Sequence, residues 1–298
     1  MLSLLCAVAC GRGRRHPPPP PAAIVDGGAA IDAAAPPPAG CDGQRHALAP
    51  GLTIERHRIA GTSALPTLTP CLELVRVDVG RYPPRLVMAS RDGAPRPVTT
   101  WADAVGAVAA VNAGMFGDDH RALGQLRDRD HVDRDRDNPR YGGWLLFDPH
   151  DPADPAVRIV GRGCAGVDVA ALRRRYRGEV QSYRLLGCDG EALAWADAKS
   201  YSAAAIAVDR HGRLVFAHLR APLRMGELAA ALATPAFDLV GALYAEGGPE
   251  ATVVAGTGAA RVTSYGSYET GFWEDDSNHT GWDVPNVLVA APPASAPP

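Results

Sequence analysis

Glu246 stands where an apolar run meets a glycine turn, in the segment GALYAEGGPEATVV. The leucine and tyrosine before it favour a strand, Gly247-Gly248-Pro249 prevents that strand from continuing, and a new strand is expected from Thr252. An ionised carboxylate is costly to remove from water. Glu246 is therefore either a solvated turn residue or an acid held at the mouth of a pocket.

Asn112 is a second candidate, in the segment AVNAGMFGDD. It follows a β-type run, and the Ala-Gly pair that ends at Gly114 turns the chain sharply. An asparagine at a strand end can donate and accept hydrogen bonds, which suits recognition of a sugar hydroxyl or a phosphate oxygen. The same side chain could simply cap the turn, and taken alone the segment favours the cap.

Two further segments carry side chains of the kind that bind sugars. Gln181 and Ser182 lie at the start of an expected strand in EVQSYRLLGCDGEAL. The segment SYGSYETGFWEDDSNHTGW is dense in aromatic and polar residues, among them Trp273 and Asp275. Such side chains stack on sugar rings and hydrogen-bond to their hydroxyls. A long ordered surface loop is the alternative, but its length and aromatic content favour a functional role.

The sequence indicates no metal site and no cofactor, and it leaves a divalent-cation requirement open. Asp133, Asp135 and Asp137 have the alternate spacing of the opening of a calcium loop. The glycine and the later acid that such a loop requires are absent, so a solvated surface loop is the better interpretation. No CxxC or Cys/His spacing suggests zinc.

Composition limits the class of protein. The chain has 298 residues, of which 46% are hydrophobic and 21% charged, with a net charge of −3. This is typical of a globular protein with one large domain. The balanced charge, and the lack of a basic stripe with interleaved aromatic residues, exclude an electrostatic nucleic-acid binder.

The N-terminal segment MLSLLCAVACG predicts export. Its Ala-Val-Ala-Cys10 end resembles a lipobox, so residues 1–10 are interpreted as a signal and Cys10 as a site of lipid attachment. The segment is short and lacks a positive n-region, which leaves an over-extended gene start as the alternative. The protein is accordingly expected to be secreted or anchored to the envelope.

A Pro/Ala-rich tether is expected at 11–40, the folded domain at 41–290 and a structureless tail at 291–298. Four cysteines fall in the domain. These are Cys41, Cys71, Cys164 and Cys188. An even set of this size is compatible with two disulfides in an oxidising compartment, or with four buried thiols.

Periodicity predicts an α+β fold, a single domain with a mixed or mostly antiparallel sheet and flanking helices. A strand is expected in CLELVRVDVG, and a hairpin joins 206–208 to 214–219 with Gly212 in its turn. A helix is expected from about Thr100, capped by threonine, and another short helix ends at Gly178. Met225, Leu228 and Leu232 form one stripe of a further helix.

The order of six motifs resembles that of the phosphodiester glycosidase family, which includes the enzyme that removes N-acetylglucosamine to uncover mannose 6-phosphate and many exported bacterial relatives. The motifs are VNAGMF, LGQL, VQSYRLL, AIAVDRHGRLVFAHL, GALYAEGG and VPNVLVA, and the likeness spans roughly Cys71 to Ala290. The resemblance implies that Asn112 and Gly114 form the Asn-x-Gly turn of the active site, and that Gly124 and Gln181-Ser182 match neighbouring motifs.

Glu246 stands where the family keeps a pocket aspartate, with Gly247 and Gly248 retained. The resemblance therefore implies that Glu246 and Asn112 are catalytic. The predicted substrate-binding residues are Gly114, Gln181, Ser182, Gly247, Gly248, Trp273 and Asp275.

One position departs from the family. Ala203 occupies the place of an arginine that precedes the first strand of the hairpin. Arginine is suited to a phosphodiester because its planar fork matches phosphate oxygens. Arg184 or Arg220 could substitute. The expected function is that of an exported hydrolase of sugar-1-phosphodiesters with a carbohydrate or sugar-phosphate substrate. The alternatives are a non-catalytic carbohydrate-binding envelope lipoprotein and a structural envelope domain without a ligand.

Overall fold

A computed structural model describes residues 40–196 and 198–293. All of them belong to one compact unit. The predicted signal at 1–10, including Cys10, lies outside the described residues, as do the predicted tether up to residue 39 and the tail from 294. No helix in the described ranges is long and apolar enough to cross a membrane.

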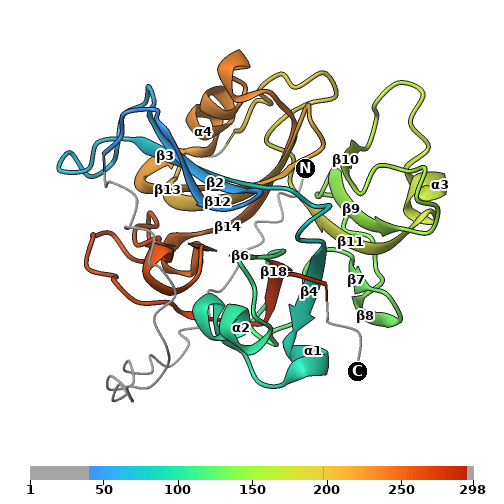
Figure 1. The fold of residues 1–298 in the computed structure, drawn as a ribbon. Coiled ribbons are helices and arrows are strands. Elements are labelled where there is room, and N and C mark those ends of the chain that lie inside the picture. The colour runs from blue at the N-terminus through green and yellow to red at the C-terminus, as the bar shows by residue number, and fades with distance from the viewer. Residues whose placement is uncertain (1–39, 197, 294–298) are drawn as a thin grey trace, which may run out of the picture. The chain divides into compact units, whose positions relative to one another are not determined.

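The largest sheet has six strands in the order β1-β2-β3-β13-β12-β14 (Figure 1). These strands are β1 (Arg45–Ala49), β2 (Leu52–Arg58), β3 (Cys71–Val77), β12 (Ser200–Asp209), β13 (Leu214–Arg224) and β14 (Leu239–Gly247). Helix α4 (Met225–Leu232) packs on one face of this sheet and buries its Met225, Leu228 and Leu232 stripe there, as the periodicity predicted.

A second sheet has the order β16-β15-β6-β18-β4, and a third has the order β10-β9-β11-β7-β8. The second consists of β4 (Pro84–Met88), β6 (Ala109–Asn112), β15 (Thr252–Ala255), β16 (Val262–Tyr265) and β18 (Asn286–Ala290). The third consists of β7 (Leu126–Asp128), β8 (His131–Arg134), β9 (Gly143–Pro149), β10 (Val157–Gly161) and β11 (Tyr176–Ser182). Side chains from all three sheets meet in one apolar core.

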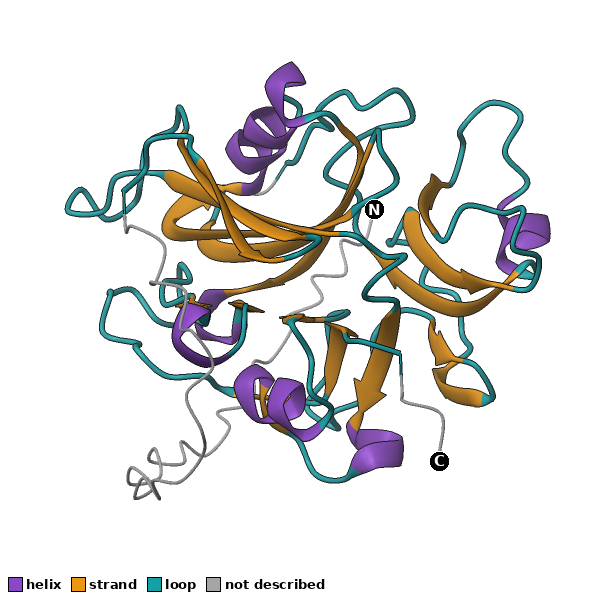
Figure 2. Ribbon diagram, in the orientation of Figure 1, coloured by secondary structure: helices purple, strands orange, loops and turns teal. Residues whose placement is uncertain are grey.

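The remaining elements are short, and Figure 2 shows how little of the ribbon is helical. They are α1 (Ala89–Asp92), α2 (Val98–Ala104), α3 (Val169–Arg173), the 3₁₀ turns Pro235–Phe237, Gly248–Glu250 and Gly258–Ala260, and the two-stranded ribbon β5 (Arg96–Pro97) with β17 (Asp283–Val284). All ladders between the described strands are antiparallel. The predicted mostly antiparallel sheet with flanking helices is confirmed.

Local signals predicted the hairpin correctly, but two helix boundaries differ. Gly212 has φ 74° in the turn between β12 and β13, as a tight hairpin requires. Helix α2 begins at Val98 after Pro97 rather than at Thr100, and no threonine side chain caps it. The helix predicted to reach Gly178 ends at Arg173. Gly178 instead lies in β11, where the Phe147 ring of the neighbouring strand occupies the space of a side chain.

The four domain cysteines form two disulfides, Cys41–Cys71 and Cys164–Cys188. Disulfides persist in oxidising compartments and are rare in the cytosol. The bonds therefore indicate an extracytoplasmic location.

Candidate active site

Glu246 lies at the end of β14, not in the turn that follows it. The 3₁₀ turn Gly248–Glu250 then carries the chain from the first sheet to β15 of the second. Glu246 pairs with Ala204 of β12, while Ala205 pairs with Tyr244, so one extra residue forms a β-bulge in β14. Bulges often redirect side chains near functional sites. The carboxyl group is partly buried.

At both glycines of the turn, neighbouring atoms occupy the space that a side chain would need. A Cβ at Gly247 would collide with the Tyr244 hydroxyl. Gly248 has φ 65°, and a Cβ there would lie 2.9 Å from Glu269 Oε2 and 3.5 Å from Glu250 Oε2. The turn therefore needs glycine for both its backbone conformation and the close approach of two carboxylates.

Three glutamates thus converge at this turn, and the sequence predicted only Glu246. Burial, reinforced by the charges of Glu250 and Glu269, raises the pKa of Glu246 well above its usual value. Burial also raises the pKa of Glu250 to about 7, with a further contribution from Glu269. Glu250 follows Glu246 by four residues, and Glu269 belongs to the aromatic loop, the segment SYGSYETGFWEDDSNHTGW at 264–282. Only the fold brings the three together.

Such a cluster holds protons at neutral pH. Neighbouring carboxylates that repel one another titrate as a unit, with one proton retained to higher pH. The cluster can therefore present a protonated carboxyl group and a carboxylate at the same time, which are the two groups that hydrolysis of a glycosidic bond uses.

A chain of aromatic rings borders the acidic turn. The Tyr141 and Tyr183 ring centroids are 4.5 Å apart, Tyr183 and Trp195 are 5.4 Å apart, and Trp195 and Tyr244 are 6.0 Å apart. Burial, with the phenol of Tyr183 and the charge of Glu246, raises the pKa of Tyr141. Tyr141 and Tyr244 therefore stand at the two ends of this wall, both within electrostatic reach of Glu246.

Asn112 is buried at the end of β6, and its Oδ1 accepts a hydrogen bond from the Thr252 backbone N–H at 3.2 Å. Its buried Nδ2 has no partner within the described ranges. Nor does any hydrogen bond among the described residues join Asn112 to Glu246. Asn112 instead fixes the first residue of β15 and so reaches the acidic turn through the backbone.

Gln181 and Ser182 hold the surrounding chain together. Gln181 Oε1 accepts from the N–H groups of Gln125 and Asn138, and its Nε2 donates to the Tyr141 carbonyl, among others. Ser182 Oγ donates to the Tyr244 carbonyl at 2.5 Å. The geometry gives both side chains a positioning role at either end of the aromatic wall; their contact with a substrate stays a prediction.

Gly114 has φ 73°, which explains a glycine after Asn112. A Cβ at Gly124 would lie 2.6 Å from the Gln181 carbonyl oxygen, so Gly124 allows this segment to approach β11.

The aromatic loop brings Trp273 to the acidic cluster but leaves Asp275 outside it. Trp273 and Glu269 exchange two backbone hydrogen bonds, and the Trp273 ring packs edge-on against Trp282 at 5.4 Å. The exposed Asp275 carboxylate accepts hydrogen bonds from the N–H and hydroxyl of Ser277.

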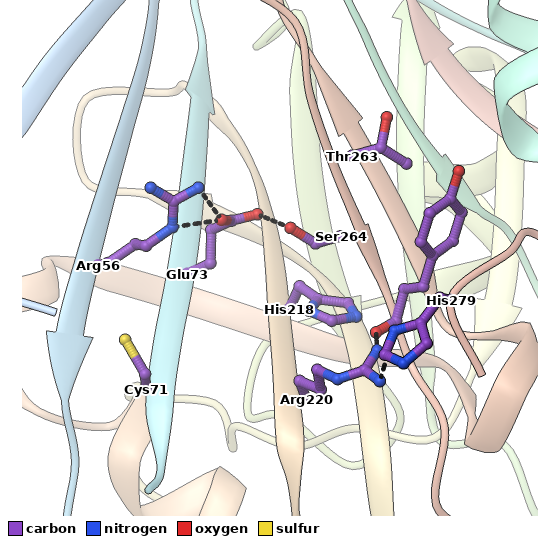
Figure 3. A pocket seen from close by; sticks show the side chains of 9 residues that line it. Arg56, Cys71, Glu73, His218, Arg220, Thr263, Ser264 and His279 are labelled. Atoms are coloured by element: carbon purple, nitrogen blue, oxygen red, sulfur yellow. Dashed lines mark hydrogen bonds and ion pairs between the residues drawn. The ribbon is translucent and has the colours of Figure 1, made fainter. Parts of the chain in front are cut away.

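The two arginines considered as substitutes for Ala203 are engaged in other contacts. Arg220 donates to the carbonyls of Tyr265 and Asn278 and forms an ion pair with Asp276, so it anchors the aromatic loop. Figure 3 shows it beside His279 of the same loop. Arg184 contacts the sulfurs of the Cys164–Cys188 disulfide. Ala203 itself is buried and pairs with Gly247.

A polar row crosses the first sheet and ends at Glu246. The directly paired residues are, in order, Arg56, Glu73, His218, Ala204 and Glu246. Directly opposed residues of neighbouring strands share a face of the sheet. The row therefore puts Ala204 alone between Glu246 and a buried histidine.

The first three residues of the row line a pocket of about 400 Å³, together with Arg220 and His279 (Figure 3). Glu73 binds Arg56 and accepts from Ser264 Oγ at 2.8 Å. Burial lowers the pKa of His218 to about 4, so this histidine is neutral at physiological pH. No group of three or more acidic, histidine or cysteine side chains in the described ranges is arranged to hold a metal ion.

Comparison with known proteins agrees with the motif order. Residues 105–291 match the family model of phosphodiester glycosidases, which confirms the resemblance predicted from the sequence. No curated protein matches.

Two solved structures share the fold. The catalytic domain of zebrafish N-acetylglucosamine-1-phosphodiester alpha-N-acetylglucosaminidase, auto-inhibited by its pro-peptide, aligns with TM-score 0.59 and 15% identity over 83% of this chain and 85% of that chain. A hypothetical protein from Synechocystis aligns with TM-score 0.51 and 16% identity over 81% of this chain and 62% of that chain. At these identities the likeness concerns the fold alone.

The Gly248→Ala variant should lose more stability than Gly258→Ala. Both glycines have positive φ, so each substitution should cost about 1–2 kcal/mol of backbone strain. A Cβ at Gly258 meets nothing within 4 Å, whereas one at Gly248 meets the Glu269 carboxylate. Urea unfolding should show an additional loss of about 1 kcal/mol or more for Gly248→Ala. Equal losses in the two variants would show that the carboxylates do not crowd this turn.

Replacing Glu250 by glutamine should stabilise the protein above neutral pH. The folded-state pKa of about 7 lies above the unfolded value of 4.5, so the contribution of Glu250 to stability is complete below about pH 4.5 and is lost as the pH rises through 7. The free energy of unfolding of Glu250→Gln minus that of the wild type should grow by roughly 2–3 kcal/mol between pH 4.5 and pH 8. A difference that does not change with pH would contradict the raised pKa. Asp130→Asn, at an exposed turn, is the control.

Proposed function

The chain belongs to the phosphodiester glycosidase family, and from this premise we propose that it is an exported hydrolase of sugar-1-phosphodiesters. The observation that carries the proposal is the acidic turn. The motif order assigns Glu246 to the family's position for a pocket acid, and two further glutamates share its partly buried environment. The substrate is a sugar linked through C1 to a phosphodiester, such as those of cell-surface polysaccharides.

The reaction makes modest demands on a protein. Water replaces the phosphate at C1: the C1–O bond breaks, a new C1–O bond to water forms, and a phosphate monoester leaves. A phosphate is a good leaving group, so the main requirement is to stabilise the oxocarbenium-like carbon and the departing anion. One carboxylate facing C1 meets the first requirement.

Glu246 is assigned to the carboxyl group that faces C1. It is ionised when the proton that the cluster shares lies on Glu250, because the charge of Glu250 is one of the causes that raise the pKa of Glu246. With a pKa of about 7, a protonated Glu250 can donate a hydrogen bond to the departing phosphate oxygen at neutral pH. Compared with an aspartate, the glutamate at 246 extends its carboxyl group by roughly 1 Å, a displacement that matters in a tight site. The β-bulge in β14 provides a means to compensate for it.

Asn112 orients the site in this proposal. It holds the first residue of β15 through Oδ1, and its buried Nδ2 is a free donor among the described residues. A substrate oxygen that reached Nδ2 would satisfy it. The partly exposed rings of Tyr183, Trp195 and Trp273 supply faces on which a sugar ring can stack.

A carbohydrate-binding protein without catalytic activity is the second candidate. It is favoured by Ala203, which replaces the family's arginine, and by an aromatic wall that would bind a sugar whether or not it is cleaved. Tight binding of a sugar phosphodiester that the wild-type protein leaves intact would support this candidate.

Export and lipid attachment at Cys10 form the cellular part of the proposal, and the two disulfides support export. Mass spectrometry of protein from a bacterial host should find Cys10 as a lipid-modified N-terminal residue, and Cys10→Ser should move the protein to the soluble fraction. Unmodified protein with reduced cysteines in the cytosol would contradict export.

Glu246→Gln should abolish most hydrolysis. The amide has the size of the acid but can neither carry the negative charge nor share the proton, so kcat should fall by about 10²–10⁴-fold. The value of kcat is measured from the release of phosphate monoester from a panel of α- and β-linked sugar-1-phosphodiesters. Asp130→Asn removes a carboxylate at an exposed turn and should retain full activity. Wild-type rates in Glu246→Gln would exclude this glutamate from the reaction.

A further inference from the structure

A basic, aromatic-lined pocket of about 420 Å³ lies beside the acidic turn. It is lined by Arg140, Arg162, Arg184, Tyr183 and Trp195, among others. None of these residues was predicted to bind substrate, and Arg184 was considered only as a substitute clamp. We propose that this pocket binds the phosphate group of the substrate, in place of the arginine missing at Ala203. This inference rests on the proposed function for the identity of the ligand.

Arg184 is built into the pocket by two glycines. Gly143 of β9 and Gly161 of β10 face each other in the ladder, and the Arg184 side chain lies across both. A Cβ at Gly143 would lie 2.5 Å from Arg184 Cγ, and one at Gly161 would collide with Arg184 Nη1. The paired glycines thus form a channel that fixes the course of this arginine.

The groups around the Arg184 guanidinium orient it without neutralising it. Its Nη1 lies 3.1 Å from Cys164 Sγ and 3.5 Å from Cys188 Sγ, which are uncharged disulfide sulfurs. Glu191 lies near enough for Arg184 to help lower its pKa, but the exposed Glu191 carboxylate accepts mainly from the Asp189 N–H of its own turn. The positive charge of Arg184 is therefore available to an anion.

The other two arginines add donors and charge. Arg162 forms an ion pair with the exposed Asp137 carboxylate, whose Oδ1 also accepts from Gln181. Arg140 is exposed, and no acidic partner for it occurs among the described residues. With three guanidinium groups against the two nearby carboxylates of Asp137 and Glu191, the pocket keeps a net positive charge. Planar guanidinium groups match the geometry of phosphate oxygens and bind them through paired hydrogen bonds.

The pocket and the acidic turn share one wall. The Tyr183 carbonyl accepts from the Tyr244 N–H at 2.9 Å, and Arg184 pairs with Leu243 in an isolated bridge, so the segment after β11 runs beside β14. Glu246 follows Tyr244 by two residues. The Tyr183 and Trp195 rings line the pocket with the arginines, and the Trp195 ring also contacts Tyr244. A sugar at Glu246 would thus place its C1-linked phosphate toward the arginines.

Binding of inorganic phosphate and glycerol 1-phosphate to the full chain tests the inference. In isothermal titration calorimetry, Arg140→Gln and Arg184→Gln should each weaken binding by about tenfold, the effect of losing one charge-assisted hydrogen-bond pair. Arg184→Lys keeps the charge and should retain part of the affinity; a melting curve of each variant checks its fold. The control is Arg210→Gln, which removes an exposed arginine that pairs with Asp238 at the β12–β13 turn and does not line the pocket. Unchanged phosphate affinity in a folded Arg140→Gln/Arg184→Gln double variant would overturn the inference.

Kinetics separate this inference from the proposed function. If the protein hydrolyses sugar phosphodiesters, the arginine variants should raise KM for them about tenfold, while hydrolysis of an uncharged aryl glycoside should not change. If the protein hydrolyses nothing but binds phosphate in an arginine-dependent manner, the phosphate site stands and the proposed function fails. Turnover with unchanged KM in the double variant would mean that phosphate is recognised elsewhere, and the site would be rejected.

Discussion

The electrostatic repulsion among Glu246, Glu250 and Glu269 is the interaction that the rest of the fold must overcome for this site to form. Burial raises the free energy of the charged forms of Glu246 and Glu250, and the charge of Glu269 adds to both. Only a backbone held from both sides can keep such groups together. The turn achieves this because Gly248 adopts positive φ and leaves room for the carboxylates, while Asn112 fixes the start of the following strand.

The large sheet and the aromatic loop supply the two sides of that support. The polar row across the first sheet ends at Glu246, so its position is fixed by the registers of β2, β3, β13 and β12 in turn. Glu269 comes from a loop with little regular structure, and Arg220 ties that loop to β13 by hydrogen bonds to two of its carbonyls. A buried or half-buried arginine that satisfies backbone carbonyls is a means of fixing a loop that no ladder can fix.

Local signals in the sequence predicted what depends on local physics. The glycine of the β12–β13 turn and the apolar stripe of α4 both appear within short windows, and the structure agrees with each. The six family motifs are short as well, and the family model matches residues 105–291. The sequence indicates Glu246 as a candidate site residue because a charged side chain beside two glycines at the end of an apolar run is unusual.

Predictions that depended on distant partners were incomplete. The sequence around Gly178 predicts a helix end, because it does not show that the Phe147 ring occupies the space of a side chain at Gly178. Glu250 and Glu269 stand in segments already considered functional, but their convergence depends on the path of a long loop. Arg184 was considered, but the channel formed by Gly143 and Gly161 is a property of strand register. Hydrophobic periodicity contains no information about such contacts.

The burial of Ala203 helps to explain why phosphate recognition would be relocated in this chain. Its side chain belongs to the apolar layer between the first sheet and α4, where leucines from several strands also pack. A guanidinium group introduced there would lose its hydration unless a new opening were made for it. The arginines beside Tyr183 and Trp195 face a pocket and have no such cost. Two differences from the family would then be connected. The longer glutamate at 246 and a phosphate site on the neighbouring sheet each shift the position, relative to β14, of the C1–O bond that is broken.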